Sequence, residues 1–517
     1  MAAAEYEKEH SDVQIVIETK EREEILSDTK TILAAKVYEN LPDVIMIEDY
    51  DVQEVLSLYE DEFVELTDKI NYEKYAGYKS QLCSKDGHMY GIPFDSGTAA
   101  LFYRLDILEQ AGYTEGDMHS LTWDEYIEIG KNVYEKTGIP MLTLDPTDFP
   151  LVRLIMQSNG CWYVKQDGST ADIENNVALE QALEIYKELL EQNIGVSVNG
   201  WNEFISAFQQ GEVASVMSGG WIISSIKENE EQAGLWRVTT IPVVSENENA
   251  VAASNVGGSS WYVLKNSANP ELATEFMVAM FGENEEFIDS LIGEIGLIPA
   301  VKEPAVYSYY GEADAFFGGQ QVTRILTRMA DRIPTVNYGS KTYEIEDIIE
   351  EEFQSALADG NLKGCLERAQ MKAEAVARFE LRNMYKEISA ETPDQWMFLC
   401  KQAIVESAGK WEAVLDMMTR SGFDISDPNK SSQTVEYGHT VDEAVQDTPY
   451  GQLSQASDYV SGRSNVTHGG KDTITNRDKL DAEIVMDLRD RWEDNMNKIV
   501  AGFDDLFIRI VGTEVEL

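Results

Sequence analysis

The sequence predicts an α/β protein with two lobes, followed by a mostly helical and loop-rich C-terminal module. Short apolar strand patterns alternate with amphipathic helix patterns through about residue 375. Residues 90–104 and residues 255–264 each combine apolar runs with a polar, glycine-containing break, as expected where a chain crosses between lobes. At 517 residues, the chain is also too long for a single hydrophobic core.

The composition is that of a globular protein with a very acidic surface. Hydrophobic residues make up 43% of the chain and charged residues 26%, and the formal net charge is -52. This charge repels phosphate backbones and anionic lipid, so we expect no nucleic-acid partner and favour a neutral or cationic ligand. Solubility in an extracellular or salty habitat explains the charge equally well.

Cysteines and histidines are scattered along the chain. Cys83, Cys161, Cys365 and Cys400 form no Cys-x-x-Cys pair, and the five histidines form no His-Glu-x-x-His motif. We therefore expect no disulfide framework, no metal site and no cofactor. No apolar run reaches the length of a membrane span, and residues 1–10 lack the basic and apolar regions of a secretion signal.

The first part of the chain predicts a parallel strand-helix-strand unit. Residues 1–10 have a helical pattern, and residues 13–18 alternate like a strand. A helix carrying Lys36 and Tyr38 follows, and residues 41–47 have the pattern of a buried strand. This order and spacing are typical of parallel α/β units.

An acidic and aromatic loop follows the second of these strands. It consists of Glu48, Asp49, Tyr50 and Asp51. Ligands bind beyond the carboxyl ends of strands in open parallel sheets, so the loop is a candidate binding site.

Residues 90–104 predict the first crossing between lobes. An apolar strand pattern breaks at Pro93, Asp95 and Ser96 lie in a small polar patch, and a second apolar strand pattern follows. The small residues in the patch would let another backbone or a ligand approach closely. An ordinary strand-turn-strand is the alternative interpretation.

The middle of the chain predicts several helices. Thr122 begins a capping box, which is a structural device. A turn at residues 143–146 leads into a helix that carries Arg153, a long amphipathic helix covers residues 176–191, and another helix starts at Trp201.

Two strand patterns in this region end beside small residues. Residues 214–223 predict a buried strand that ends on small residues and then on Trp221. The flat ring of Trp221 suits stacking against a sugar ring. Residues 255–264 repeat the polar and glycine-rich break and predict the return crossing. Each aromatic taken singly is better explained by packing in the core; their shared position at strand ends favours ligand binding.

An ordered series of segments resembles the extracellular solute-binding proteins of bacterial ABC importers, in the carbohydrate-binding branch that includes maltose-binding protein. The resemblance covers about residues 1–375 and rests on residues 41–50, 71–104, 160–163, 207–221, 255–276, 316–320 and 336–343. It implies a periplasmic-binding-protein-like fold, a carbohydrate bound between two lobes without catalysis, a membrane permease as partner and an extracellular or cell-surface location.

The resemblance also implies the ligand contacts. Carboxylates accept several hydrogen bonds from sugar hydroxyls, and aromatic rings cover sugar faces. The residues carried over are Glu48, Asp49, Asp95, Ser96, Asp145, Arg153, Trp162, Trp221, Gly257, Gly258, Ser259, Asn337 and Tyr338.

The implied domain division follows the two crossings. We expect residues 1–97 and 257–312 to form the first lobe, residues 98–256 and 313–377 the second, and residues 378–517 an appended module. The family's signal peptide and first strand are missing, which a late start codon or a gene fragment would explain.

The appended module is similar to minor structural or collar-type proteins of tailed phages. The similarity lies in residues 448–451, in residues 468–472, which include His468, and in a closing helix pattern over residues 479–510. His468 itself fits a turn better than a ligand site. Helix patterns cover residues 379–418, and residues 421–478 have the composition of extended or loop segments.

Two alternatives to sugar binding stay open on the sequence. The chain has enough carboxylates for a glycoside hydrolase, which needs two carboxyl groups on either side of one scissile bond. The C-terminal module could instead supply a structural or assembly function.

Overall fold

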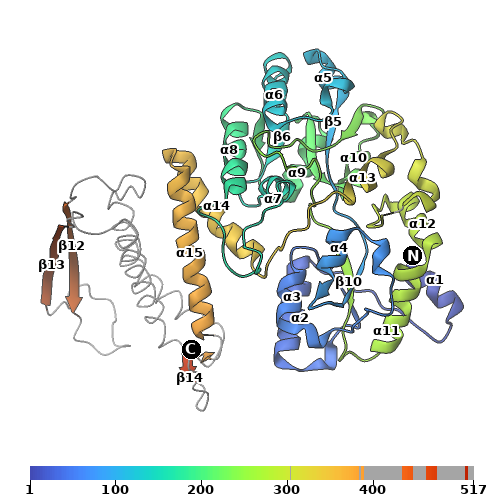
Figure 1. The fold of residues 1–517 in the computed structure, drawn as a ribbon, viewed down its shortest axis with the longest axis horizontal. Helices are drawn as coiled ribbons and strands as arrows, with labels where there is room; N and C mark the ends of the chain where they lie inside the picture. The colour runs from blue at the N-terminus through green and yellow to red at the C-terminus, as the bar shows by residue number, and fades with distance from the viewer. Residues whose placement is uncertain (303, 384–385, 389–433, 446–461, 474–506, 510–517) are drawn as a thin grey trace, which may run out of the picture. The chain divides into compact units, whose positions relative to one another are not determined.

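A computed structural model describes residues 1–302, 304–383, 386–388, 434–445, 462–473 and 507–509 (Figure 1). The chain divides into two compact units, Met1–Ala373 and Glu374–Leu517. The first unit contains two separate three-stranded sheets, which are the basis of its architecture.

The first sheet has the order β1-β10-β4 and is antiparallel throughout. Its strands are β1 (Val44–Glu48), β10 (Ser259–Val263) and β4 (Gly91–Pro93). Successive side chains of β10 enter different cores, because Tyr262 packs with Ile45 and Ile47 while Val263 packs with Ile92. The helices in this part of the fold are α1 (Ala2–Glu9), α2 (Arg22–Ala35), α3 (Val52–Tyr59), α4 (Gly77–Leu82), α11 (Pro270–Met277) and α12 (Glu285–Ile295).

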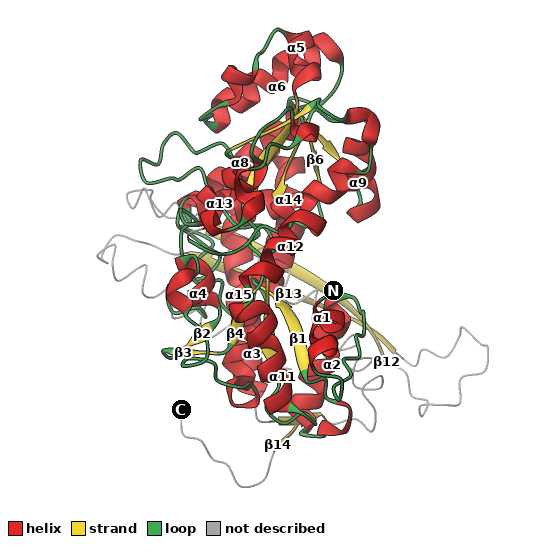
Figure 2. Cartoon of the chain, turned by 90° about the vertical axis from the view of Figure 1, so that its right-hand side faces the viewer, coloured by secondary structure: helices red, strands yellow, loops and turns green. Residues whose placement is uncertain are grey.

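The second sheet has the order β8-β5-β9 and is also antiparallel. Its strands are β8 (Ser215–Gly219), β5 (Ala99–Arg104) and β9 (Trp236–Thr239), and a parallel pair, β6 (Leu142–Leu144) and β7 (Gly195–Ser197), lies in the same part of the fold. Figure 1 shows β5 and β6 among α5 to α8, while β10 lies among α2, α3 and α4; Figure 2 shows the same two groups from the side.

The helices that accompany the second sheet include most of the longer ones. They are α5 (Leu105–Ala111), α6 (Trp123–Thr137), α7 (Pro150–Ser158), α8 (Val177–Glu191), α9 (Gly200–Gln209), α10 (Ile223–Lys227), α13 (Val322–Ala330), α14 (Thr342–Asp359) and α15 (Leu362–Asn383). The predicted capping box is present, since Thr122 and Glu125 bond reciprocally at the start of α6.

Short elements complete the first unit. They are β2 (Ser84–Lys85), β3 (His88–Met89), the π-helix η7 (Val278–Glu283) and the 3-10 helices η1 (Tyr38–Asn40), η2 (Glu60–Glu62), η3 (Tyr72–Lys74), η4 (Glu115–Met118), η5 (Gly220–Ile222), η6 (Glu230–Gln232), η8 (Pro304–Val306), η9 (Ser308–Gly311) and η10 (Ala315–Phe317). No helix in the described part of the chain is both long and apolar enough to cross a membrane.

The two predicted crossings connect the sheets and lie side by side. β4 belongs to the first sheet and β5 to the second, and the chain returns from β9 to β10. The amide of Val256 donates to the carbonyl of Gly97 at 2.7 Å. A Cβ on Gly97 would lie 2.6 Å from the Val256 carbonyl oxygen, so a glycine is needed for this approach.

The predicted parallel strand-helix-strand unit at the start of the chain is wrong. Residues 13–18 are not a strand, and Val16 and Ile17 are 76% and 72% exposed. An alternating pattern makes a strand only where a neighbouring strand supplies hydrogen bonds, and β1 pairs with β10 instead. The helix α2 also ends at Ala35, before Lys36 and Tyr38.

Two strand pairs are described in the second unit. β11 (Lys386–Ile388) pairs with β14 (Phe507–Arg509), and β12 (Thr434–Val445) pairs with β13 (Gly462–Thr473), both antiparallel. α15 continues to Asn383, past residue 375, where the resemblance to the binding-protein family ends. Residues 448–451 and nearly all of the predicted closing helix lie outside the described residues. Where the structure describes these segments, the prediction was wrong: residues 507–509 of the predicted helix are a strand, and His468, expected in a turn, lies within β13. The division into lobes at residues 97, 257, 313 and 377 stays a prediction.

Candidate functional site

A cavity of about 450 Å³ is lined by residues from both sheets and from the helices beside them. Glu48 ends β1 of the first sheet, Met217 belongs to β8 of the second, and Gly257 lies on the return crossing. Helices α2, α7, α9 and α14 supply further lining side chains. The volume falls within the range of roughly 300–1,000 Å³ that is usual for small-molecule sites.

Two tryptophans form an aromatic wall of this cavity. Trp221 lies in η5 directly after β8 and is 36% exposed, and its Nε1 donates to the Val256 carbonyl at 2.9 Å. Trp201 is the second residue of α9 and is 54% exposed. The two ring centroids are 5.6 Å apart with an interplanar angle of 34°. Such exposed indole faces can cover a flat, partly apolar ligand.

Glu48 and Arg22 form a charged group at the cavity. Arg22 contacts the Glu48 carboxylate at 3.5 Å and the Asp51 carboxylate at 2.7 Å. The Tyr343 hydroxyl donates to Glu48 at 3.3 Å. Burial and the negative charge of Asp51 raise the pKa of Glu48 to about 7, although Arg22 and Arg153 oppose this shift. Glu48 can therefore exchange a proton near neutral pH.

Arg153 and Glu346 form a buried ion pair at the same cavity. Arg153 also donates to Asp148 at 2.6 Å, and the Tyr163 hydroxyl donates to Glu346 at 2.7 Å. The Nε of Arg153 is buried and has no hydrogen-bond partner among the described residues. Burial raises the pKa of Glu346, while the Arg153 guanidinium opposes the shift. The protein thus holds both charges in fixed positions.

Asp145 connects two elements of the cavity wall. Its Oδ1 accepts from the amide and the hydroxyl of Thr147 at 2.9 and 2.7 Å, and its Oδ2 accepts from the Gly200 amide at 2.8 Å. The side chain therefore joins the turn after β6 to the first residue of α9.

Asp49 points into a buried polar network at the crossings. It forms an ion pair with Lys79, and both side chains are fully buried. Asn255 donates to the Asp49 carboxylate at 3.3 Å. Burial raises the pKa of Asp49 to about 6, and Lys79 opposes this shift. This network links β1 with α4 and with the return crossing.

Asp95, Ser96 and Ser259 also bond within the crossings. Asp95 accepts from the amide and the hydroxyl of Ser259, both at 2.7 Å. The Ser96 hydroxyl lies 2.8 Å from the Tyr78 hydroxyl and 2.6 Å from that of Thr98. Asp95 and Ser259 thus connect the two crossing segments, whereas Ser96 bonds to α4 and within its own crossing.

Three further predicted contacts bond within the core that contains the second sheet or in loops at its surface; they are Trp162, Tyr338 and Asn337. Trp162 is buried, and its Nε1 donates to Thr342 at 2.9 Å. The Tyr338 ring lies 4.5 Å from that of Trp162, and both contact Tyr50. Asn337 donates to the Gln166 carbonyl at 3.1 Å.

The structure therefore divides the predicted ligand contacts into two groups. Those that line the cavity are Glu48, Asp145, Arg153, Trp221 and Gly257. Those that do not are Asp49, Asp95, Ser96, Trp162, Gly258, Ser259, Asn337 and Tyr338. Contact with a ligand stays a prediction for every member of both groups.

Sequence reasoning missed several lining residues. Trp201, Tyr343 and Glu346 line the cavity without having been predicted, and so does Arg22. Tyr343 and Glu346 are three positions apart on α14, which places them on one helix face. That spacing could have indicated Tyr343 and Glu346, and the polar turn before α9 could have indicated Trp201.

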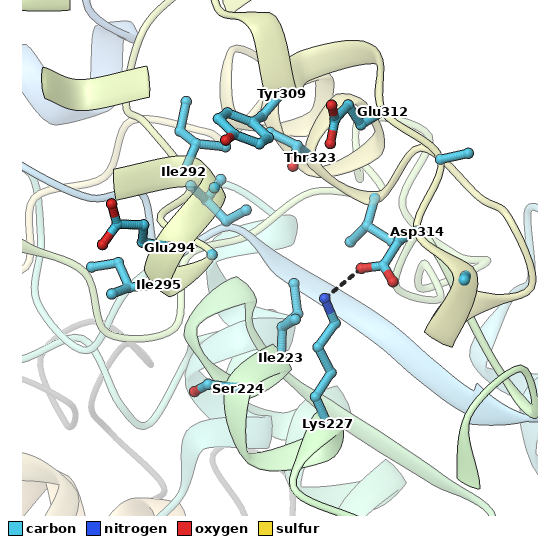
Figure 3. A pocket seen from close by; sticks show the side chains of 16 residues that line it. Ile223, Ser224, Lys227, Ile292, Glu294, Ile295, Tyr309, Glu312, Asp314 and Thr323 are labelled. Carbon is cyan, nitrogen blue, oxygen red and sulfur yellow. Dashed lines mark ion pairs between the residues drawn. The ribbon is translucent and has the colours of Figure 1, made fainter. Parts of the chain in front are cut away.

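A second cavity of about 370 Å³ is lined by residues of α10, α12, α13 and the loop near Tyr309 (Figure 3). Its walls carry isoleucines, including Ile223 and Ile292, and an ion pair of 2.7 Å between Lys227 and Asp314. None of the predicted ligand contacts lines this second cavity. The first cavity is therefore the better candidate site.

Comparisons with known proteins agree with this architecture. The family model described as bacterial extracellular solute-binding protein matches residues 1–308. A lactose-binding protein of Rhizobium radiobacter is 40% identical over 352 residues, which cover 68% of this chain and 83% of the relative.

Two solved structures have a similar fold. The GacH receptor of Streptomyces glaucescens superposes with a TM-score of 0.61 and 18% identity, covering 74% of this chain and 94% of the receptor. The galacto-N-biose-/lacto-N-biose I-binding protein of the ABC transporter from Bifidobacterium longum gives a TM-score of 0.58 and 20% identity, covering 73% and 92%. The predicted binding-protein-like fold is thus confirmed for the part of the chain that these structures cover.

Proposed function

This chain belongs to the bacterial extracellular solute-binding proteins, and from that premise we propose that it binds a mono- or oligosaccharide and delivers it to an ABC-type permease. The proposed site is the cavity between Trp221 and Glu48. A protein of this kind captures its ligand without changing it, so the proposed role is non-catalytic.

The position of Trp221 is the observation that carries this proposal. Its partly exposed indole lines the cavity, and a hydrogen bond to the return crossing fixes the ring. Glu48 and Arg153 line the same space with hydrogen-bonding groups. An aromatic face beside carboxylates and guanidinium groups matches the two surfaces of a sugar, which has apolar ring faces and polar hydroxyl edges.

The relatives support a carbohydrate ligand over other polar solutes. The relative that is 40% identical to this chain is named a lactose-binding protein. The two structural neighbours share only the fold; the first binds acarbose and the second lacto-N-biose in their solved complexes. Lactose is therefore the first sugar to test.

The family description also supports a location outside the cytoplasm. We infer that the protein works at the cell surface or in the periplasm, where it meets its sugar before the permease does. The contribution of residues from both sheets to one cavity fits a protein whose bound state a permease can recognise.

Binding by the full-length protein can be measured with isothermal titration calorimetry and tryptophan fluorescence. We would titrate glucose, galactose, lactose, maltose, raffinose and maltotriose, and expect at least one saturable isotherm. Trp221→Ala should weaken the tightest of these by about tenfold or more, because a central stacking ring is lost. Tyr134→Ala is the matched control, since Tyr134 is an exposed aromatic outside the cavity. Absence of binding to every sugar would contradict the proposal.

Catalysis can be tested with the same panel. The cavity carboxylates already bond to protein groups, since Glu346 contacts Arg153 and Asp145 contacts Gly200. We therefore expect labelled lactose or maltotriose to be recovered intact after prolonged incubation. Steady release of a shorter product would contradict non-catalytic binding and favour a glycoside hydrolase.

The appended module, residues 378–517, supports no second function. The matched residues 1–308 do not include it, so its resemblance to phage structural proteins stays a prediction.

A further inference from the structure

We propose that the second cavity binds a small organic ammonium ion, that is, an amine cation carried on a short hydrocarbon body. This site is separate from the proposed sugar site and does not depend on it, because no described residue lines both cavities. Its volume of about 370 Å³ also lies within the range of roughly 300–1,000 Å³ that is usual for small-molecule sites.

The floor of the second cavity is apolar and comes from both halves of the fold. Ile223 of α10 and Val322 of α13 belong to the core of the second sheet, whereas Ile292 of α12 belongs to a core of the first. All three side chains are buried. Such a floor favours the hydrocarbon part of a ligand, because contact with it removes apolar surface from water.

The rim of the cavity carries an excess of negative charge. Glu294 of α12, together with Glu312 and Asp314 between η9 and η10, lines the cavity. Lys227 is the one cation among the described lining residues, and it already pairs with Asp314 at 2.7 Å (Figure 3). The exposed side chains of Glu294 and Glu312 have no hydrogen-bond or ion-pair partner within the described ranges. These two carboxylates therefore favour a cationic ligand.

Tyr309 adds an aromatic face to the same cavity. Its ring is 37% exposed, and it lies close to α12, since a Cβ on Gly293 would be 2.3 Å from Tyr309 Cζ. The amide of Glu312 donates to the Tyr309 carbonyl at 3.3 Å, which keeps a carboxylate in the same loop as the ring. An ammonium group is attracted both to an aromatic face and to carboxylates.

The helix ends at the cavity do not set the sign of the ligand charge. α12 ends there, while α13 and the short α10 begin there. Partial charges of opposite sign therefore meet at the cavity, and each is smaller than the charge of one carboxylate. The side-chain charges decide which ions bind.

The test compares three molecules of similar length that differ in charge. Hexylammonium, hexan-1-ol and hexanoate would be titrated into the full-length protein at low ionic strength and followed by ligand-observed NMR. We expect hexylammonium to bind saturably with a Kd of about 1 mM or tighter, hexan-1-ol about fivefold more weakly, and hexanoate more weakly still. No binding of hexylammonium, or equal binding of hexylammonium and hexan-1-ol, would overturn the proposal.

Substitutions at the rim locate the ammonium group. Glu294→Gln combined with Glu312→Gln should weaken hexylammonium by about fivefold or more and leave hexan-1-ol unchanged. Glu128→Gln is the matched control, because Glu128 is exposed on α6 and lines neither cavity. If the double variant binds hexylammonium as well as the control does, the amine binds elsewhere on the acidic surface and the proposal is wrong.

Lys227→Met should have the opposite effect. It removes the cation at the rim and frees the Asp314 carboxylate, so hexylammonium should bind about threefold more tightly or better. A general loss of structure would not produce tighter binding. Unchanged or weaker binding by this variant would contradict the assignment of charges at the rim.

Lactose titrations of the same variants separate this inference from the proposed function. None of the substituted residues lines the first cavity, so the affinity for lactose should be unchanged. A loss of lactose binding in the rim variants would contradict the separation of the two sites. If wild type binds no sugar, the proposed function fails, whereas the ammonium site is still decided by the hexylammonium titrations.

Discussion

The hydroxyl of Tyr343 on α14 donates a hydrogen bond to the carboxylate of Glu48 at the end of β1, with 3.3 Å between the oxygens. Tyr343 packs against the core of the second sheet, whereas Glu48 belongs to the first. The bond therefore joins the two sides of the cavity at the group whose pKa is raised to about 7. Protonation of Glu48 removes the negative charge that makes its carboxylate a strong acceptor for this bond.

Glu48→Gln should change how stability depends on pH. Between the ordinary carboxyl value of 4.5 and about 7, the folded protein keeps a proton on Glu48 that the unfolded chain has lost. Raising the pH through this interval therefore destabilises the wild type through this group, and glutamine cannot titrate. The melting temperature of the variant relative to wild type should rise from about pH 5 to about pH 8.

The control for this experiment is Glu128→Gln, because Glu128 is exposed on α6. Its melting temperature relative to wild type should stay constant over the same interval. A constant difference for Glu48→Gln as well would show that burial does not raise the pKa of Glu48.

Lys79→Met should strongly lower the free energy of unfolding. Lys79 and Asp49 are fully buried and pair with each other, so removing the cation leaves a buried carboxylate without its partner. The cost of breaking such a pair is about 3–5 kcal/mol. Urea unfolding followed by tryptophan fluorescence measures the change.

Two further variants separate the pair from general effects of substitution. Asp49→Asn combined with Lys79→Met removes both charges and should recover part of the loss. Lys30→Met breaks a partly exposed ion pair with Glu54 and should cost much less. Equal losses for Lys79→Met and Lys30→Met would refute the importance of the buried pair.

The local sequence predicted the crossings well, because their signal is local. Glycines and small polar residues between apolar strands appear in residues 90–104 and 255–264, and the structure places their strands in two different sheets. The strand predicted at residues 13–18 does not form, because β1, the strand expected beside it, pairs with β10 instead. Alternation is a property of the segment, whereas a strand requires a neighbour.

The sequence alone could not show which of two adjacent candidate residues lines the cavity. Glu48 and Asp49 are consecutive acids, yet Glu48 lines the cavity while Asp49 meets Lys79, a residue 30 positions away. Trp162 and Trp201 likewise look equivalent in the sequence. Trp162 packs in the core, where Thr342, distant in the chain, accepts its Nε1 hydrogen, whereas Trp201 stays exposed.

Gly258→Ala should destabilise the protein more than Gly296→Ala. Both glycines have positive φ, of 84° and 70°, so both substitutions carry the strain of about 1–3 kcal/mol that this backbone region imposes on other residues. A Cβ on Gly258 would also lie 2.7 Å from Asp49 Oδ2 and 2.9 Å from the Gly97 amide nitrogen, whereas a Cβ on Gly296 would meet open space. The difference between the two variants isolates the contact between the crossings. Thermal unfolding of both measures it, and equal melting temperatures would show that the crossings separate without cost at Gly258.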